Sequence, residues 1–404
     1  MYKILITSVL HIVHRTSIFV HSLSLYMQLI QKQRLAIATI FFMNGFGFAN
    51  IMARLPEIQT LYGMNNATLG TALFCRAAGA LLAMPFVGWL GMRFSSGNIT
   101  KLMCFSIVVI IPLLVVMPSL WVLMPMLYML GMAEGMMDVN MNEQAVLIER
   151  GYNRPIMSSF HAVFSGGMAL GASCGVAMAH YNVPLLTHFF AVSIFCLILV
   201  LIASPNFVQT GKKQASAEEQ PLFLLPSKAI LPLGIIAFCC MTGEGAMIEW
   251  SAVFMKQIHH ETDSFSGIAL TSFNLAMLFG RTIGDYLNKK LGQKRLLIFD
   301  SIAAVIGLAI VLAIPLSWVS LLGFFIVGIG LSTIVPIVYS AAGNTEGVSP
   351  SVGISMATSV GYAGFFVGPP IIGYLAEAFD LRVGLLFTLS LFVVMLFLIN
   401  RRKY

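Results

Sequence analysis

The chain has 404 residues, of which 58% are hydrophobic and only 10% are charged, and its mean hydropathy is +0.89. Soluble globular domains carry about 25% charged residues, so this composition excludes that class and indicates an integral membrane protein. The net charge of +7 comes from short basic clusters between apolar runs. This pattern is typical of a membrane topology signal and not of a nucleic-acid-binding surface.

The first 26 residues are apolar but contain His11, His14, Arg15 and His21. They form a poor membrane span, and they lack the small-residue cleavage site of a secretory signal. Two interpretations remain: an interfacial helix, or a start codon assigned too early, with Met27 as the true beginning. Residues 1–33 are therefore treated as an N-terminal extension that is not required for the core, and no function is assigned to them.

Twelve apolar runs after this extension are long enough to cross a hydrocarbon core of about 30 Å, which takes roughly 20 helical residues. The sequence thus predicts an all-α membrane protein with twelve transmembrane helices. The expected spans are 35–55, 66–90, 100–118, 120–148, 157–181, 183–204, 230–256, 266–288, 295–315, 317–342, 351–375 and 381–400.

The longest polar interruption, residues 205–229, divides the predicted helices six and six. The expected domains are an N-terminal bundle over 34–204 and a C-terminal bundle over 230–404, joined by this cytoplasmic linker. If the first span starts in the cytoplasm, most basic residues between spans lie inside, and only Arg54, Lys256 and Arg382 lie outside. That imbalance places both ends of the helical body in the cytoplasm.

The six cysteines lie inside apolar runs and show no metal-ligand spacing. We expect reduced thiols, with no disulfide framework, metal site or cofactor. They are Cys75, Cys104, Cys174, Cys196, Cys239 and Cys240.

The densest polar chemistry lies within the predicted span 120–148. Glu134, Asp138 and Asn142 fall within an arc of about 80° on one face of a helix. Each acid would cost roughly 2.5–3.5 kcal/mol in lipid, so this face must meet protein or a wet cavity. It is either a polar contact between helices or, as we favour, a solute or proton site. Glu134 lies near the middle of the membrane, so we expect it to be the main proton carrier, with Asp138 contributing less.

Two further ionisable groups lie in predicted spans. Arg76 is too deep to reach the membrane surface fully, so it requires a carboxylate or a bound anion. Its partner is either Glu134 or Asp138 in a structural ion pair, or else the substrate. His161 can change its charge near neutral pH, although a single histidine in a helix is often only a packing residue.

Other polar residues complete the candidate substrate and proton site, and their hydroxyl and amide groups suit a hydroxylated solute. These are Asn44, Asn50, Glu244, Glu249, Asn274, Tyr339 and Tyr362. Arg281 and Asp285 are four residues apart near a predicted cytoplasmic end, where an ion pair suits a gate better than a solute contact. The candidate gating residues are Arg93, Arg281, Asp285 and Lys289.

An internal repeat relates the two halves, because glycine landmarks recur at nearly one offset. Gly131 corresponds to Gly328 and Gly167 to Gly364, each shifted by 197 residues. Agreement at several spans predicts two homologous six-helix bundles, with function at their interface. Glycines at four-residue spacing also indicate closely packed helices.

Twelve helices, a central loop and a six-plus-six repeat resemble the major facilitator superfamily over residues 34–403. The family motif G-x-L-x-D-R-x-G-R-R is matched by Gly88, Leu90 and Arg93, whereas Met92 and Ser95 depart from it. The segment FHAVFSGGMALGA, residues 160–172, is similar to the YbjJ-like bacterial branch. The resemblance implies a monomeric, multi-pass carrier of the bacterial inner membrane and names no substrate.

One departure concerns the antiporter signature of the superfamily, a G-P pair in the fifth helix. Here Gly171 precedes Ala172, and the G-P pair occurs only at Gly368 and Pro369. This departure disfavours an antiporter.

The favoured function is secondary active transport of a small polar solute, a sugar or sugar acid, in symport with protons. The halves would rock about a site in the middle of the membrane, with Glu134, Asp138 or Glu244 taking up the proton. The alternatives are a drug or metabolite efflux carrier and a transporter-like sensor without transport. Phosphate-binding and hydrolase motifs are absent from the sequence, so an enzyme is not expected. The expected partners are the solute, protons and the lipid bilayer.

Overall fold

The structure is a computed structural model of the chain. It describes residues 2–91, 93–152, 156–209, 227–346, 348 and 350–402. Within those ranges the side chains at 2–26, 84, 85, 88, 89, 158, 285, 350 and 351 are outside the description.

The described chain consists of helices joined by short turns. The α-helices are α1 (Tyr2–Ala53), α2 (Leu55–Leu61), α3 (Asn66–Gly91), α4 (Ser96–Leu113), α5 (Leu120–Tyr152), α6 (Met157–His180), α7 (Leu185–Ala203), α8 (Leu231–Ile258), α9 (Asp263–Leu291), α10 (Gln293–Ala313), α11 (Ser317–Leu331), α12 (Ile334–Gly343), α13 (Pro350–Ala378) and α14 (Leu381–Arg401). A single 3-10 turn, η1 (Ser204–Asn206), follows α7.

Ten segments of the described chain are long and apolar enough to cross a membrane, with α11 and α12 together forming one of them. The helices α3 and α9, with 26 and 29 residues, have the required length as well. Together they account for the twelve predicted spans and confirm the all-α membrane fold. The additional short helix α2 begins beside Pro56, which is favoured in the first turn of a helix.

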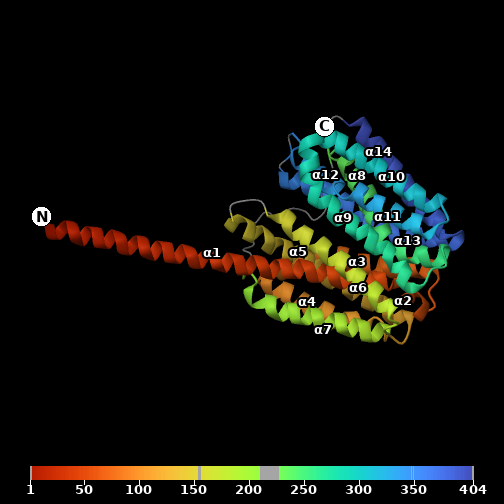
Figure 1. Cartoon of the computed structure of the whole chain (residues 1–404), viewed down its shortest axis with the longest axis horizontal. Coiled ribbons are helices and arrows are strands. Elements are labelled where there is room, and N and C mark those ends of the chain that lie inside the picture. Colours follow the sequence, from red (N-terminus) through yellow and green to blue (C-terminus); the bar gives the residue numbers. More distant parts are fainter. Residues whose placement is uncertain are drawn as a thin grey trace.

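Helix α1 runs without a break from Tyr2 into the bundle, and Figure 1 shows its N-terminal part projecting beyond the other helices. The sequence analysis separates residues 1–33 from the core as an extension. In the structure one helix continues through residues 33 and 34. The physical reason is local, because neither glycine nor proline occurs before Gly45. Those two residues are the strongest breakers of a helix.

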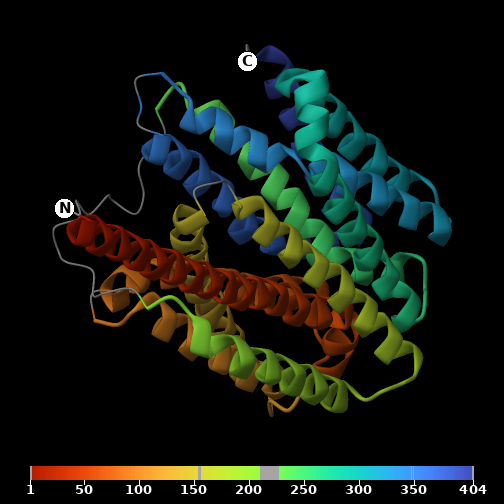
Figure 2. The same ribbon diagram turned by 60° about the vertical axis from the view of Figure 1, so that its left-hand side comes forward.

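The helices form two groups, which we call the N half (α1 to α7) and the C half (α8 to α14). Figures 1 and 2 show the red-to-green N half on one side and the green-to-blue C half on the other. Within the halves α1 packs on α6, α3 on α5, and α8 on α13. Two extensive contacts join the halves, α3 with α13 and α6 with α9. We call the surface where the halves meet the seam.

The two contacts across the seam are related by the sequence repeat. A Cβ added at Gly70 on α3 would lie 3.1 Å from the Cα of Gly373 on α13. In the other contact a Cβ added at Gly267 on α9 would lie 2.8 Å from Val176 on α6. Gly70 and Gly267 differ by 197 positions, as do Val176 and Gly373. The two halves therefore meet through equivalent positions, as the predicted repeat requires.

The predicted span 317–342 is interrupted at Ser332 and Thr333, between α11 and α12. Pro336 lies in the first turn of α12, and it cannot donate the backbone hydrogen bond that would continue the preceding helix. The hydroxyl of Thr333 donates instead to the buried carboxylate of Asp300 on α10. This interaction stabilises the break, and the sequence analysis did not single out Asp300.

The Gly131→Ala substitution is expected to destabilise the N half. A methyl group at Gly131 on α5 would overlap the carbonyl oxygen of Arg76 on α3. Overpacking of this kind typically costs about 1–3 kcal/mol. Thermal unfolding of the purified protein should show a lower midpoint for Gly131→Ala, whereas Gly166→Ala is the control because nothing lies within 4 Å of an added Cβ there. Equal midpoints for the two variants would contradict the close packing of α3 on α5.

Candidate functional site

Arg76 on α3 links the two halves of the molecule. Its Nε donates to Glu134 Oε2 on α5 over 2.8 Å, and its NH1 lies 3.8 Å from Glu249 Oε1 on α8. The guanidinium carbon is also 4.0 Å from the centre of the Phe48 ring on α1, a distance typical of a cation–π contact. Of the two carboxylates that the sequence offered as ion-pair partners, Glu134 is the one bound, and Glu249 of the C half is a second partner. We call these four residues the Arg76 cluster.

Glu249 is held much less firmly than Glu134. Its side chain is only 7% exposed, its Oε1 is beyond hydrogen-bonding distance of Arg76, and its buried Oε2 has no hydrogen-bond partner among the described atoms. A buried ionised carboxylate without partners is costly. Glu249 is therefore the carboxylate of this cluster that would gain most from a proton or a bound cation.

Arg281 on α9 forms the second link across the seam. Its NH2 lies 3.1 Å from Glu244 Oε1 on α8, and its NH1 donates to the Ser165 hydroxyl on α6 over 2.9 Å. His161, one turn before Ser165, keeps an exposed side chain and interacts electrostatically with Arg281. We call these four residues the Arg281 cluster. Ser165 was not among the predicted site residues.

Asp138 lies one turn beyond Glu134 on α5 and belongs to neither ion pair. The amide of Asn142 donates to its Oδ1 over 3.3 Å and to its backbone oxygen over 2.8 Å. Across the seam, Tyr362 on α13 interacts electrostatically with Asp138 and with Tyr339 on α12. Asp138, Asn142 and Tyr362 are half-buried, so this part of the seam keeps polar surface.

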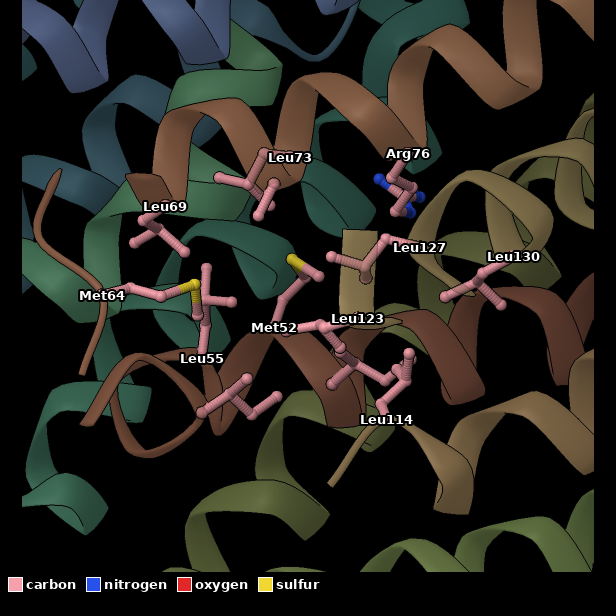
Figure 3. Close-up of a pocket in the computed structure, with 13 residues that line it drawn as sticks. Met52, Leu55, Met64, Leu69, Leu73, Arg76, Leu114, Leu123, Leu127 and Leu130 are labelled. Atoms are coloured by element: carbon pink, nitrogen blue, oxygen red, sulfur yellow. The ribbon is translucent and has the colours of Figure 1, made fainter. Parts of the chain in front are cut away.

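An apolar cavity of about 30 Å³ lies in the N half beside Arg76 (Figure 3). Apart from Arg76 its lining is apolar, including Met52, Leu73 and Leu127. Sites for small organic ligands usually enclose about 300–1,000 Å³, so this cavity is too small for a solute. It leaves free volume next to the guanidinium group inside the N half.

A hydrogen-bonded group, which we call the latch, joins the halves at the end of the molecule far from the linker. Asn66 and Gln257 exchange two side-chain hydrogen bonds of 2.9 and 3.1 Å, and Gln257 also donates to Gln59 over 3.3 Å. Beside them, Asn65 donates to Glu377 over 3.1 Å and the backbone amide of Asn66 donates to Glu377 over 3.0 Å. These bonds hold the halves together at this end.

The sequence analysis did not find the latch, although the repeat contains a signal for it. Gln59 donates to Asn66 over 3.2 Å in the N half, and Lys256 donates to Asp263 over 2.6 Å in the C half. The two pairs occupy positions that differ by 197 residues, the offset of the glycine repeat. Lys256 also reaches Thr60 across the seam, over 3.4 Å. Applying the offset to polar residues would have identified both pairs.

Two titratable groups near the latch have shifted pKa values. Burial and the nearby Arg382 lower the pKa of His259, which shares a 2.9 Å hydrogen bond with Ser320. Burial raises the pKa of Tyr62, whose hydroxyl donates to the Leu114 carbonyl over 2.7 Å. Both shifts favour the neutral form of the group.

Three predicted site residues form no described hydrogen bond or ion pair with the two charged clusters. Asn50 is fully buried and hydrogen bonds to His188 on α7 over 2.9 Å, and His188 in turn contacts Arg54 over 3.2 Å, so this network is internal to the N half. Asn44 is half-buried on α1. Asn274 on α9 is buried with its Nδ2 unpartnered among the described atoms.

The predicted gating residues do not form one group. Arg93 and Lys289 have exposed side chains near the linker end of their halves. The side chain of Asp285 lies outside the described residues. Arg281 was expected to bind Asp285 near the surface, but its described partners are Glu244 and Ser165 within the seam. A long arginine side chain can reach neighbouring helices, and spacing along one helix did not indicate these two partners.

Comparison with known families agrees with this architecture. The sequence model of the Major Facilitator Superfamily matches residues 37–345. The chain belongs to the major facilitator superfamily. An uncharacterized MFS-type transporter of Yersinia pestis is 33% identical over 353 residues, covering 87% of this chain and 91% of that protein. Membrane protein MosC of Rhizobium meliloti is 32% identical over 367 residues, covering 89% and 87%.

Solved structures of the superfamily share the fold at low sequence identity. The nucleoside transporter NupG superposes with a TM-score of 0.72 at 12% identity, covering 92% of this chain and 100% of that one. A bacterial homolog of the human lysosomal transporter Spinster, inward-facing and unoccupied, gives a TM-score of 0.73 at 12% identity, covering 93% and 96%. The chain is thus a multi-pass membrane transporter of this superfamily and not an enzyme.

Proposed function

We propose that the protein is a proton-coupled secondary transporter for a small, polar, hydroxylated solute, working by alternating access. Superfamily members of this architecture move one half against the other around a site between them. The support in this chain is the concentration of charged and polar side chains at the seam. The proposal takes the solute to be sugar-like and the coupling to be symport.

The observation that carries the proposal is that one guanidinium group, that of Arg76, serves carboxylates of both halves. Glu134 belongs to its own half and is bound directly, whereas Glu249 belongs to the other half and is 3.8 Å away. A proton on Glu249 would remove its attraction to Arg76 and weaken the link between the halves. Proton uptake and relative motion of the halves are thereby coupled through one residue.

The polar residues near Asp138 are the proposed contacts for the solute. Asn142, Tyr339 and Tyr362 offer amide and hydroxyl groups that can donate to and accept from hydroxyl groups. A sugar acid fits less well than a neutral or cationic solute, because both guanidinium groups of the seam already bind carboxylates. Drug or metabolite efflux and a sensor without transport remain alternatives that the transport assay separates.

The proposed topology places the protein in the bacterial inner membrane as a monomer, with both ends of the helical body in the cytoplasm. The support is the accumulation of lysine and arginine at the linker end of the helices. The proposed domains are 34–204 and 230–404, with the linker over 205–229.

The direct test uses purified protein in liposomes that contain a pH-sensitive dye. Sugars, polyols and their amino and acid derivatives are added one at a time. Only a transported solute should change the pH of the lumen. A labelled active solute should then accumulate under an imposed pH gradient and exchange without one. Binding of a solute without any flux would favour the sensor, and flux limited to lipophilic cations would favour drug efflux.

Cross-linking the latch is expected to stop transport. In an Asn66→Cys/Gln257→Cys variant with an oxidant or a short bifunctional reagent, the halves cannot separate at this end, so one of the two access states is blocked. Uptake should fall to the level of protein-free liposomes, and for an oxidised pair a reductant should restore it.

The two single-cysteine variants are the controls, since neither can form the link within one molecule. They should keep uptake after the same treatment. Full uptake by a cross-linked double variant, with the link confirmed by mass spectrometry, would show that the latch does not open during transport.

A further inference from the structure

We infer that the transported solute carries one positive charge, a protonated amine, and that Asp138 is the carboxylate that binds it. The inference rests on the proposed transport function and specifies the chemistry of its solute. It follows from the charge balance of the seam and from the partners of each charged group.

In the part of the seam formed by the Arg76 cluster, the Arg281 cluster and Asp138, the described side chains contain more carboxylates than cations. Four carboxylates face two guanidinium groups, a net charge of −2 when all are ionised. The carboxylates are Glu134, Asp138, Glu244 and Glu249, and the guanidinium groups are Arg76 and Arg281. A protonated His161 would reduce this net charge only to −1.

The partners show which charges are uncompensated. Glu134 and Glu244 each have a guanidinium nitrogen within 3.1 Å. Glu249 lies 3.8 Å from a guanidinium group that is already bound to Glu134, and its Oε2 has no partner in the described part of the chain. Asp138 has no ion pair among the described residues, and its carboxylate accepts one hydrogen bond from a neutral amide.

These two uncompensated carboxylates differ in accessibility, and that difference assigns their roles. Glu249 is buried beside Arg76, where a second organic cation would be repelled by the guanidinium, so a proton is the better occupant. Asp138 is half-buried, next to Asn142 and across the seam from Tyr362. If the ammonium group of the solute binds Asp138, the neighbouring hydroxyl groups of the solute come within reach of Asn142 and Tyr362.

One proton on Glu249 and one ammonium on Asp138 together neutralise the seam. A transporter that moves a charged site through a low-dielectric membrane region meets a large electrostatic cost unless the site is neutral. An anionic solute in place of the ammonium would leave a net charge of −2 with Glu249 protonated, or −3 with Glu249 ionised, and both described guanidinium groups already bind carboxylates. The charge balance thus favours a cationic solute over the sugar acid that the sequence suggested.

The first experiment measures ligand-induced thermal stabilisation with two matched probe sets. Each set compares an amine, a neutral molecule and an acid. Glucosamine and glucuronate differ from glucose at C2 and at C6, respectively, whereas glucamine, glucitol and gluconate differ from one another only at C1. We expect the amines to bind at least about tenfold more tightly than the neutral members, and the acids not to bind. Asp138→Asn should abolish the preference for the amine, while the exposed Glu346→Gln, which also removes one negative charge, should keep it.

The second experiment does not depend on the scaffold of the probe. The Asn142→Cys variant is made in a background that also carries Cys75→Ser and Cys174→Ser at two half-buried cysteines. Its thiol is then modified with a cationic and with an anionic methanethiosulfonate. The ratio of the modification rate with the cationic reagent to the rate with the anionic reagent should be about tenfold higher than for a free thiol in solution. Asp138→Asn should largely remove this preference.

The inference is overturned by tighter binding of the acids, by equal binding of amine and neutral members, or by an Asn142→Cys variant that shows no preference for the cationic reagent. If no probe binds, the thiol reaction alone decides. Both assays are independent of flux. Amine binding without transport would therefore sustain the charge assignment while refuting the proposed function.

Discussion

In liposomes with an imposed pH gradient, the Glu249→Gln variant is expected to lose accumulation of the solute while still exchanging it. A symporter that moves one proton per solute can concentrate the solute about tenfold per pH unit, because one unit corresponds to about 1.4 kcal/mol. Glutamine has nearly the same shape but cannot bind or release the proton, so the accumulation ratio should fall to about one. Counterflow of labelled solute without a gradient should remain measurable.

Glu134→Gln and Glu346→Gln are the comparison variants. The sequence predicted Glu134 as the main proton carrier, whereas the structure shows it bound to Arg76 over 2.8 Å. Glu346 is exposed beyond α12, so its replacement should leave accumulation unchanged. If Glu134→Gln loses accumulation and Glu249→Gln retains it, the proton is carried by the N half as the sequence suggested.

The Arg76→Leu substitution is expected to cause the largest loss of stability. It leaves the buried carboxylates of Glu134 and Glu249 without their cation. Removing one partner of a buried ion pair typically costs about 3–5 kcal/mol. Thermal unfolding and size-exclusion profiles of the purified variant should show a lower midpoint and more aggregation than the parent, together with loss of transport.

A rescue variant separates charge from packing. Arg76→Leu/Glu134→Gln/Glu249→Gln removes both orphaned charges and should recover most of the stability without recovering accumulation. If Arg76→Leu is as stable and active as the parent, the arginine is dispensable. If the triple variant is as unstable as the single one, Arg76 stabilises the protein mainly through its contact with Phe48 and the packing of its side chain.

The predicted spans agree closely with the helices. The expected spans 66–90, 157–181 and 381–400 correspond to Asn66–Gly91, Met157–His180 and Leu381–Arg401. This agreement follows from hydropathy, since the thickness of the membrane fixes the length of an apolar run and short polar turns mark its ends. The break at Thr333 was not predicted, although Pro336 is visible in the sequence, because proline is also tolerated within membrane helices.

Contacts between distant residues were harder to predict. The sequence placed Arg76 and Glu134 in the same bundle, and the cost of an unpaired buried charge made Glu134 one candidate partner beside Asp138 and the substrate. It could not identify Glu249 as the second partner, because which α8 residue faces α3 depends on how the two halves are docked. Arg281 was assigned to Asp285 by helical spacing, yet its described bonds cross to other helices.

The composition of the latch has a consequence for the response of the protein to ionic strength. The paired hydrogen bonds between Asn66 and Gln257 join neutral amides, and dissolved salt does not screen such bonds as it screens exposed charges. Opening this end exchanges amide–amide bonds for amide–water bonds of similar strength. The balance between the two access states should therefore change little from fresh to saline media. The exceptions are the contributions of the exposed Glu377 carboxylate and of the partly exposed Lys256–Asp263 pair.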